Sequence, residues 1–485
     1  MSLLLLSVII AVIGGYWFWL HLEKRKRLSG FPSPRSWPII GHATIIKRDP
    51  EEFLDQVMGM GYLYPTKPRL VLFWIGYIPS LMVFSPENIE KIVTCSKHLE
   101  KGQAYDLLQP WLGLSLLTSA GDRWRSRRKL LTTTFHYRIL TDFIPVFNKQ
   151  AKILIEQLFK SNLKVEISKY VTLCALDIIC ETSMGRCVSA QLNETSDYVR
   201  AVYRINDIIQ NRQKAPWLYN DMLFHVFGEG KEHDWALNVL KSFTRKVMEE
   251  RRQELEQRNY AVSGLQPFLD LLLTMAKDGQ ISIEDVQSEV DTFMFEGHDT
   301  TATGLTWALH MMGSHPEVQE KAYAEINDVV GDAEEITMEH LGQLKYLECC
   351  LKESLRLYPS VPIYVRRLGC DQEFEGIMVP AGTQVLLNAY LVHRDPNHWD
   401  NPEEYRPERF EDGVKRHPYS FIPFSAGSRN CIGQRFALME EKTVMAWILR
   451  NFQLQSLQRR DEVRAKSELI LRPIGGIHLQ LTPRH

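Results

Sequence analysis

The sequence predicts a mainly α-helical protein with small β-sheets, built as one large domain behind an N-terminal transmembrane helix. Three observations predict this class. An uncharged apolar run occupies residues 3–20, apolar residues recur at helical spacing from about residue 87 to 355, and short β-rich segments flank that helical region. The sequence has no internal repeat or low-complexity block, and nothing in it marks a second domain boundary.

Composition and charge exclude several classes of protein. The 485 residues carry 57 Lys and Arg against 59 Asp and Glu, a net charge of −2, and 45% are hydrophobic. So much apolar surface excludes dominant disorder, and the near-zero net charge argues against nucleic acid as a partner. The eight cysteines include no Cys-x-x-Cys pair, so we expect neither a disulfide scaffold nor a structural zinc site.

Residues 1–22 form the predicted transmembrane anchor. As a helix, the uncharged run 3–20 would span about 27 Å, close to the bilayer core of about 30 Å. The basic cluster at 24–27 follows it, so the positive-inside rule places the body in the cytosol. The alternative is a cleaved signal peptide, which would carry its basic residues before the apolar run and small residues at its end. The bulky aromatic end favours the uncleaved anchor.

A basic and Pro-rich tether is predicted over residues 23–42, because the prolines of its second half cannot continue a helix. The body, residues 43–485, is then mostly helical. Segments rich in Val, Ile and Leu beside Gly and Pro are typical of strands and turns, and they occupy residues 70–74, 80–84, 360–388 and 468–482.

A long helix is predicted over residues 283–312. Ser282 and Asp285 form a capping-box pattern at its start, and Pro316 ends it after Gly313. Its length of about 45 Å is enough to cross a whole domain.

Acidic residues interrupt the apolar centre of this helix. We expect Glu296, Asp299 and Thr300 to face one way, because they are spaced three and four residues apart. The alternative is a solvated stripe. Phe and Met residues on several faces favour burial instead, and unpaired buried acids are costly, so the segment is predicted to be functional.

The strongest candidate site is the loop around Cys431, in the sequence FIPFSAGSRNCIGQRFA at residues 421–437. Cys431 lies between a Gly-containing loop and an amphipathic helix that begins near Gln434. A helix N-terminus, together with Arg429 and Arg435, favours a thiolate. Such a thiolate is a candidate nucleophile, redox sensor or metal ligand, whereas an inert packed cysteine would not need this charged neighbourhood.

The pattern Phe424-x-x-Gly427-x-Arg429-x-Cys431-x-Gly433 resembles the haem-thiolate signature of the cytochrome P450 family. The resemblance implies that Cys431 is the proximal iron ligand and that backbone N–H groups of the loop bond its sulfur, while Gly427 and Gly433 allow the backbone to approach the sulfur or the flat haem closely. It also implies that Phe424 shields the sulfur and that Arg429 pairs with a haem propionate.

The resemblance covers residues 32–484 and implies the cytochrome P450 fold, with residues 43–485 as a haem-thiolate monooxygenase catalytic domain that binds haem b. The EGHDTT sequence beginning at Glu296 resembles the oxygen-activation segment of the fatty-acid ω-hydroxylase branch, family 4. There the equivalent Glu can esterify a haem methyl, so Glu296 is a candidate for a covalent haem link. Thr300 and Asp299 would be the catalytic residues that deliver protons.

Other haem contacts are implied on a second helix. Trp124 and Arg128 share a helical face and both donate hydrogen bonds, which suits a haem propionate. The resemblance places Arg366 at another propionate-binding position. The remaining basic residues of this helix are expected on a solvated face: Arg125, Arg127 and Lys129.

Glu353 and Arg356 lie three residues apart and can pair on one helix face. Alone, this spacing is typical of a routine surface ion pair. The resemblance adds Arg409, in the sequence PERF at 407–410, and so implies a structural triad.

The implied function is insertion of one oxygen atom from O2 into fatty-acid-like lipids, by ω-hydroxylation, at the endoplasmic reticulum membrane. The sequence has no GxGxxG after a strand and no phosphate loop, so electrons are expected from an external NADPH-cytochrome reductase flavoprotein, with cytochrome b5 as a second candidate donor. The expected docking face carries Arg429, Arg435 and Lys442.

Three alternatives compete with this function. Eicosanoids, sterol-like lipids or xenobiotics would suit the same chemistry. A haem-thiolate isomerase or dehydratase that uses a preformed peroxide, and a non-catalytic membrane haem sensor or carrier, would not need Thr300 and Asp299, whose presence argues against both.

Overall fold

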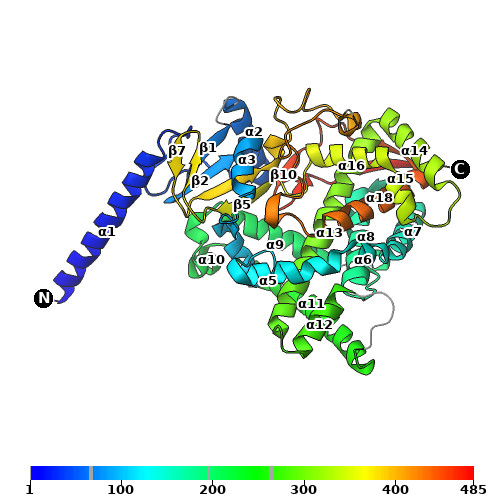
Figure 1. Cartoon of the computed structure of the whole chain (residues 1–485), viewed down its shortest axis with the longest axis horizontal. Helices are drawn as coiled ribbons and strands as arrows, with labels where there is room; N and C mark the ends of the chain where they lie inside the picture. The colour runs from blue at the N-terminus through cyan, green and yellow to red at the C-terminus, as the bar shows by residue number, and fades with distance from the viewer. Residues whose placement is uncertain (1, 65–68, 194–196, 261–266, 412, 485) are drawn as a thin grey trace.

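The protein is a mainly helical body with small sheets, as predicted, and a long N-terminal helix projects from it (Figure 1). The structure is a computed structural model, and it describes residues 2–64, 69–193, 197–260, 267–411 and 413–484.

The α-helices account for most of the described chain. In order they are α1 (Ser2–Arg27), α2 (Pro50–Leu63), α3 (Pro86–Val93), α4 (Gln109–Leu112), α5 (Gly121–Thr132), α6 (Tyr137–Thr141), α7 (Ile144–Lys160), α8 (Ile167–Ser183), α9 (Asp197–Gln213), α10 (Asp221–Phe227), α11 (Gly230–Gln257), α12 (Phe268–Lys277), α13 (Ile283–Ser314), α14 (Pro316–Val330), α15 (Met338–Gln343), α16 (Lys345–Leu357), α17 (Ala389–Val392) and α18 (Gln434–Asn451). Short 3₁₀ helices are η1 (Gln103–Leu108), η2 (Thr133–Phe135), η3 (Ala190–Leu192), η4 (Pro216–Leu218), η5 (Pro407–Phe410) and η6 (Gly427–Arg429).

The strands form four small sheets, mostly in the regions predicted to be β-rich. A five-stranded sheet has the order β1-β2-β8-β5-β3, with β2 and β8 parallel and the other neighbours antiparallel. The others have the orders β4-β12-β9, β10-β11 and β6-β7. Their bounds are β1 (Leu70–Ile75), β2 (Ile78–Val83), β3 (Glu100–Lys101), β4 (Lys164–Glu166), β5 (Ile363–Arg367), β6 (Gln372–Phe374), β7 (Ile377–Val379), β8 (Gln384–Asn388), β9 (Phe452–Ser456), β10 (Ala465–Ser467), β11 (Leu471–Pro473) and β12 (His478–Pro483).

Helix α1 is long and apolar enough to cross a membrane over residues 5–27. It continues through the basic cluster, so residues 23–27 are helical rather than part of an irregular tether. The cause is local, because residues 20–27 are mostly good helix formers such as Leu, Glu, Lys and Arg, and the next glycine after them is Gly30. At its end, Arg25 lies over the Trp74 ring of β1, 4.7 Å from the ring centroid.

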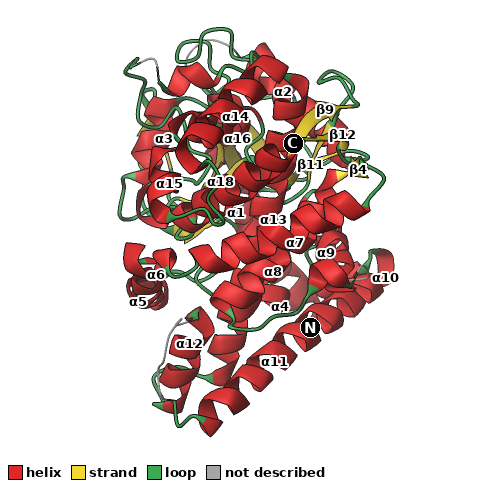
Figure 2. Ribbon diagram, turned by 90° about the vertical axis from the view of Figure 1, so that its right-hand side faces the viewer, coloured by secondary structure: helices red, strands yellow, loops and turns green. Residues whose placement is uncertain are grey.

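The central helix, α13, forms as predicted and ends within two residues of the expected boundary. Asp285 N–H donates to Ser282 Oγ (3.0 Å) and Ser282 N–H donates to Asp285 Oδ2 (3.3 Å), which completes the capping box. Helix α14 then begins at Pro316. The core packs around α13, while a second apolar cluster lies against the five-stranded sheet. Figure 2 shows the helices around α13, with β4, β9 and β12 gathered along one side.

Candidate active site

A cavity of about 390 Å³ lies between the Cys431 loop, the centre of α13 and the five-stranded sheet. Its volume falls within the range of about 300–1,000 Å³ that small-molecule sites occupy. Apolar side chains form much of its wall. The predicted site residues that line it are Trp124, Arg128, Glu296, Thr300, Phe424, Arg429, Cys431 and Gly433.

Cys431 lies in a tight loop that leads into α18. Its N–H donates to the Phe424 carbonyl (2.9 Å), and the Gly433 N–H bonds its sulfur. Gly427 has a left-handed φ of +69°, and a side chain there would collide with the carbonyl of Val93 in α3. The loop therefore needs this glycine to keep the sulfur facing the cavity.

The protein alone does not keep the Cys431 thiol ionised. Burial, and secondarily the negative Glu296 carboxylate, raises the pKa of this thiol to about 11, although the Gly433 N–H and Arg128 oppose the shift. The predicted effect of the helix N-terminus is therefore outweighed by desolvation. A coordinated metal ion, which deprotonates a thiol, would be needed to hold the anion.

Buried cations surround the same cavity. Arg128 donates to the carbonyl and side-chain oxygens of Asn430 (2.8 and 2.7 Å), while Arg429 donates to backbone carbonyls and stacks on Trp124, 4.2 Å from the ring centroid. Burial, with Arg366 adding to it, lowers the pKa of Arg429 to about 9. Within the described ranges no carboxylate forms an ion pair with these arginines, so the two propionates of a haem fit this uncompensated charge.

Arg366 does not line the cavity itself, although it is close enough to Arg429 to lower the pKa of that guanidinium. It is buried, and its Nη2 lies 3.4 Å from Ser425 Oγ. Its neighbour across the β3–β5 ladder, Lys101, does line the cavity together with Tyr105. Sequence reasoning missed Lys101, because a two-residue strand without a motif gives no signal.

The centre of α13 presents Glu296 and Thr300 to the cavity. Thr300 Oγ1 donates to the Glu296 carbonyl (2.7 Å). Burial raises the pKa of Glu296 to about 7, although the Lys101 ammonium opposes the shift. The glycine between them, Gly297, allows close helix packing, because a Cβ there would lie 2.5 Å from Ile179 Cδ1 in α8.

Asp299 does not face the cavity with Glu296 and Thr300, which corrects the sequence prediction. Its buried carboxylate lies on another side of α13, where Arg472 Nη2 is 2.6 Å from both oxygens and Asn206 Nδ2 donates at 3.1 Å. Adjacent residues of an α-helix are rotated by about 100°, so a side chain next to Thr300 points elsewhere.

Arg472 and Glu468 connect Asp299 to the surface, and no motif marked either residue. Arg472 lines a second, polar crevice and lies 3.4 Å from Glu468 Oε2. Glu468 lines both the crevice and the main cavity. Arg472 and Glu468 therefore place Asp299 on a polar connection between the main cavity and the crevice.

The structure brings the three residues of the expected triad together. Arg356 Nε lies 2.7 Å from Glu353 Oε2, and Arg409 Nε lies 3.1 Å from Glu353 Oε1. All three side chains are fully buried. Arg356 also donates to the carbonyls of His393 and Pro402 (2.9 and 2.7 Å), so the triad ties α16 to the chain that follows it.

One arginine expected on a solvated face is buried. Arg127 Nη2 pairs with Asp285 Oδ2 (2.5 Å), and Arg127 Nε lies 3.9 Å from Glu289 Oε1. It therefore ties α5 to the start of α13, whereas Arg125 and Lys129 are exposed as expected.

The predicted docking face is also corrected. Arg429 and Lys442 are buried, and Lys442 donates to the Leu341 carbonyl and to Glu348 Oε2 (3.1 Å for the latter). Of the three cations named for that face, Arg435 is exposed. Helical spacing alone could not reveal that α15 and α16 cover Lys442.

Another part of the cavity carries an ammonium group that the sequence did not reveal. Lys214, after the end of α9, donates to the Arg48 carbonyl (2.5 Å) and lies over the Phe53 ring. Burial lowers the pKa of Lys214 to about 8. Gln210 and Gln213 of α9 line the cavity as well.

Comparison with known proteins agrees with this geometry. A family model described as Cytochrome P450 matches residues 31–481. The chain is 47% identical to Cytochrome P450 4V2 of Homo sapiens over 484 residues, covering 96% of this chain and 92% of the relative. It is 43% identical to Cytochrome P450 4c3 of Drosophila melanogaster over 487 residues (95% and 90%) and 38% identical to Cytochrome P450 4c21 of Blattella germanica over 482 residues (96% and 95%).

Proposed function

Because the chain belongs to the cytochrome P450 family, within its family 4, it is a haem-thiolate monooxygenase that binds haem b, and we propose that it hydroxylates fatty acids at the ω carbon. One observation carries the proposal. The same apolar cavity holds a cysteine sulfur and, in a different part, the buried ammonium group of Lys214.

The two groups line the same cavity, but different charged neighbours act on each of them. The charges that act on Lys214 are Asp207, Asp49 and Glu468, whereas those that act on Cys431 are a separate set that includes Glu296 and Arg128. A fatty-acid carboxylate at Lys214 would leave the chain to extend along apolar walls toward Cys431. Such a substrate would present its methyl end to the reacting group, which is the requirement for ω selectivity.

The haem, when bound, supplies oxygen activation and the transfer of one oxygen atom to a C–H bond. The chain's own residues orient it and exclude water. Cys431 would ligate the iron, Arg128 and Arg429 would hold the propionates, and Trp124 and Phe424 would close the cavity around the macrocycle.

Proton delivery is assigned to Thr300 and Asp299. The Thr300 hydroxyl faces the cavity and would hold the proton that is passed into it. The Asp299 carboxylate, held by Arg472 at 2.6 Å, would receive protons from the polar crevice on the other side. Transfer to Thr300 would require Asp299 to leave Arg472.

Glu296 would esterify a haem methyl. Glu296 would contribute the carboxylate oxygen of that ester, and turnover with O2 and NADPH would supply the two-electron oxidation that its formation requires. The cavity location of Glu296 and the Lys101 ammonium, which opposes the rise in its pKa, support this role.

Electrons would come from a separate NADPH-cytochrome reductase flavoprotein, with cytochrome b5 as a second donor. Exposed cations on α5 and at the start of α18 support a revised docking face of Arg125, Lys129 and Arg435. The bond from Arg128 to Asn430 (2.8 Å) holds α5 against that loop, so its exposed side adjoins the loop.

Product analysis tests the proposal. The enzyme, supplied with reductase, NADPH and a panel of saturated and polyunsaturated fatty acids, is expected to give ω alcohols, identified by mass spectrometry. Lys214→Gln should raise KM about tenfold or more for free acids but little for their methyl esters, because only the acid carries the charge. Lys47→Gln, at an exposed lysine, is the matched control.

The alternatives predict other results. Eicosanoid, sterol-like or xenobiotic products without ω alcohols would move the substrate class to another lipid. NADPH oxidation without any oxygenated product would favour a haem sensor or carrier. An equal KM effect of Lys214→Gln on acid and ester would remove the carboxylate anchor.

A further inference from the structure

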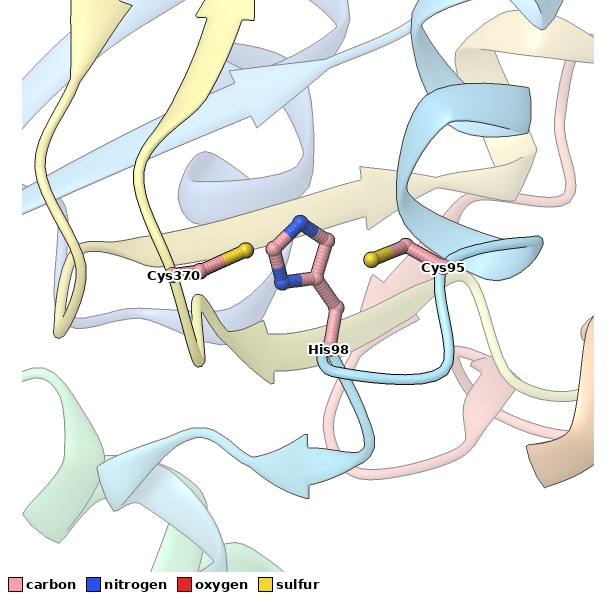
Figure 3. Close-up of side chains that lie close together, drawn as sticks. All are labelled: Cys95, His98 and Cys370. Atoms are coloured by element: carbon pink, nitrogen blue, oxygen red, sulfur yellow. The ribbon is translucent and has the colours of Figure 1, made fainter.

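A second cluster of metal-binding side chains lies outside the haem cavity. Cys95 follows α3, His98 precedes β3, and Cys370 follows β5, yet their ligand atoms all lie within 4.8 Å of one another. Figure 3 shows the two sulfur atoms on either side of the imidazole ring. His98 is buried and both cysteines are partly exposed, so solvent reaches the cluster from one side.

We propose that Cys95, His98 and Cys370 bind one Zn²⁺ ion, with water as the fourth ligand. Two thiolates and an imidazole are ligands that select zinc, and a water molecule can complete the tetrahedron from the partly exposed side. Metal–ligand bonds of about 2.0–2.3 Å place tetrahedral ligand atoms about 3.5–3.8 Å apart. The three ligand atoms lie within 4.8 Å of one another, so a bound ion would draw them closer together.

The hydrogen bonds of His98 identify its metal-binding nitrogen. The Gly369 N–H donates to Nδ1 (3.2 Å), so Nδ1 carries a lone pair and Nε2 carries the proton. Nε2 lies 3.2 Å from Gln372 Oε1 and donates to it. Metal-bound histidines usually donate their other N–H to such an oxygen, so Gln372 would already orient the ring, and Zn²⁺ would replace the Gly369 contact at Nδ1.

The site would brace two strands next to the haem cavity. The β3–β5 ladder pairs Glu100 with Arg367 and Lys101 with Arg366, directly beyond His98 and before Cys370. The Leu99 carbonyl, next to His98, accepts a hydrogen bond from Arg429 Nε (2.9 Å). A metal that joins these segments would hold Lys101 and Arg429 in place, and this consequence rests on the haem function.

The absence of a Cys-x-x-Cys pair led us to expect no structural zinc. The ligands are instead a Cys-x-x-His pair and a cysteine 272 residues after His98 in the sequence, which only the fold brings together. The proposal therefore departs from that expectation, which considered only ligands that are close together in the sequence.

Zinc binding is tested on the haem-loaded, full-length protein under a thiol-free reductant. After chelator treatment and dialysis, Zn²⁺ is titrated by calorimetry, and zinc per haem is measured by mass spectrometry. Wild type should bind one ion, and Cys370→Ser and His98→Gln should each lower affinity at least tenfold. Cys187→Ser, at an exposed cysteine elsewhere, should leave binding unchanged.

Three results would overturn the proposal. They are no binding by wild type, equal binding by Cys370→Ser and His98→Gln, and a Cys95–Cys370 disulfide in protein isolated with free thiols blocked. A preserved haem-thiolate spectrum shows that each variant is folded. The binding measurement does not depend on substrate turnover, so its failure is distinct from failure of the proposed hydroxylation.

The brace has its own readout. In protein that has not turned over, and so has formed no ester to Glu296, haem transfer to an excess of apomyoglobin should slow severalfold when Zn²⁺ is added to wild type. It should not change for Cys370→Ser. Equal rates of haem transfer with and without bound zinc would contradict the proposed coupling of the zinc site to Lys101 and Arg429. The site would then bind metal without affecting the haem cavity.

Discussion

Glu296 distinguishes this cavity chemically, because its carboxylate lines the wall and interacts with both the Lys101 ammonium and the Cys431 thiol. Glu296→Ala should abolish acid-stable attachment of haem and raise the proportion of ω−1 product. The reason is that a carboxylate oxygen forms the link and a tethered haem holds its orientation. Acid–organic extraction followed by chromatography measures the attached haem, and mass spectrometry measures the product ratio.

A second carboxylate in the same cavity provides the control for Glu296. Glu441 also lines the wall, and burial raises its pKa to about 8, but it belongs to α18. Glu441→Gln should leave haem attachment intact. If Glu296→Ala changed neither haem attachment nor the product ratio, the proposed role of Glu296 would be wrong.

Residue types at the site could be predicted from the sequence better than the directions of their side chains. The cysteine loop and the EGHDTT segment carry their residues in fixed local order, so Cys431, Glu296 and Thr300 reach one cavity. Asp299 and Lys442 point elsewhere, because a neighbouring element covers each of them. Helical spacing defines a face but does not say what packs against it.

Helix α13 contains a buried acid that should make stability depend on pH. Burial raises the pKa of Asp291 to about 7, although hydrogen bonds from Thr244 and Gln287 oppose the shift. Between the unfolded pKa near 3.8 and this value, the folded chain binds more protons than the unfolded chain. The free energy of unfolding should therefore fall as pH rises through this window, by up to about 1.4 kcal/mol per pH unit.

Asp291→Asn should make that dependence less steep by the contribution of this one carboxyl, because the amide stays neutral and its oxygen can still accept from Thr244 and Gln287. Chemical denaturation of the variant and of wild type at pH 5, 6, 7 and 8 measures the slope. Glu256→Gln, at an exposed acid on α11, should keep the wild-type slope. An unchanged slope in Asp291→Asn would show that this carboxyl does not hold its proton in the folded chain.

The ion triad that joins α16 to η5 should contribute strongly to stability. Glu353→Gln leaves the buried guanidinium groups of Arg356 and Arg409 without a counter-charge, which costs about 3–5 kcal/mol. Denaturant unfolding and the yield of haem-loaded protein measure the loss. Glu411→Gln breaks an exposed contact with Lys321 at 4.0 Å and should cost less than about 1 kcal/mol. Similar losses of unfolding free energy in Glu353→Gln and Glu411→Gln would contradict the prediction that the buried triad contributes more to stability than an exposed ion pair.

The ends of elements were predictable where local chemistry sets them. Ser282 and Asp285 cap α13, and Pro316 starts the next helix, so both ends were found from a few residues. The end of α1 was not found, because its basic residues were assigned to a tether although they favour helix. Strand β3 depends on pairing with β5, and a pairing between distant segments leaves no local pattern.

At the scale of the whole molecule, the spacing of apolar residues predicted the fold class and the single helical body. It could not predict sites that are assembled from distant segments of the chain. Asp299 meets Arg472 across 173 residues, and Glu468 joins two cavities. The zinc ligands come from two segments that no spacing rule connects. Such contacts are products of the fold, and the sequence contains no local signal for them.

The whole molecule also has an apolar surface where α1 meets the body. Trp17 of α1 packs on Tyr77 with 5.5 Å between ring centroids. The next segments are close by, because a Cβ added to Gly76 would lie 4.0 Å from both the Ile39 carbonyl oxygen and the Pro216 Cβ. Figure 1 shows α10 and the β1–β2 hairpin on the side of the body from which α1 projects. The membrane-facing patch that we define here has these exposed residues: Trp37, Ile39, Ile40, Tyr77, Trp217, Met222, Val226 and Phe227.

This patch should hold the body on a bilayer without the anchor. Deletion of residues 2–20 is expected to leave the protein in the membrane pellet after a high-salt wash, because Met222 and Phe227 are 70% and 76% exposed and can insert into lipid. Met222→Asp and Phe227→Asp should each lower the partition coefficient about tenfold, since burial of one large apolar side chain contributes about 1.5–3 kcal/mol. Leu457→Asp, at an exposed apolar residue elsewhere, should have no effect. Release by the deletion alone, or an equal effect of Leu457→Asp, would refute a membrane-facing patch and leave α1 as the sole attachment.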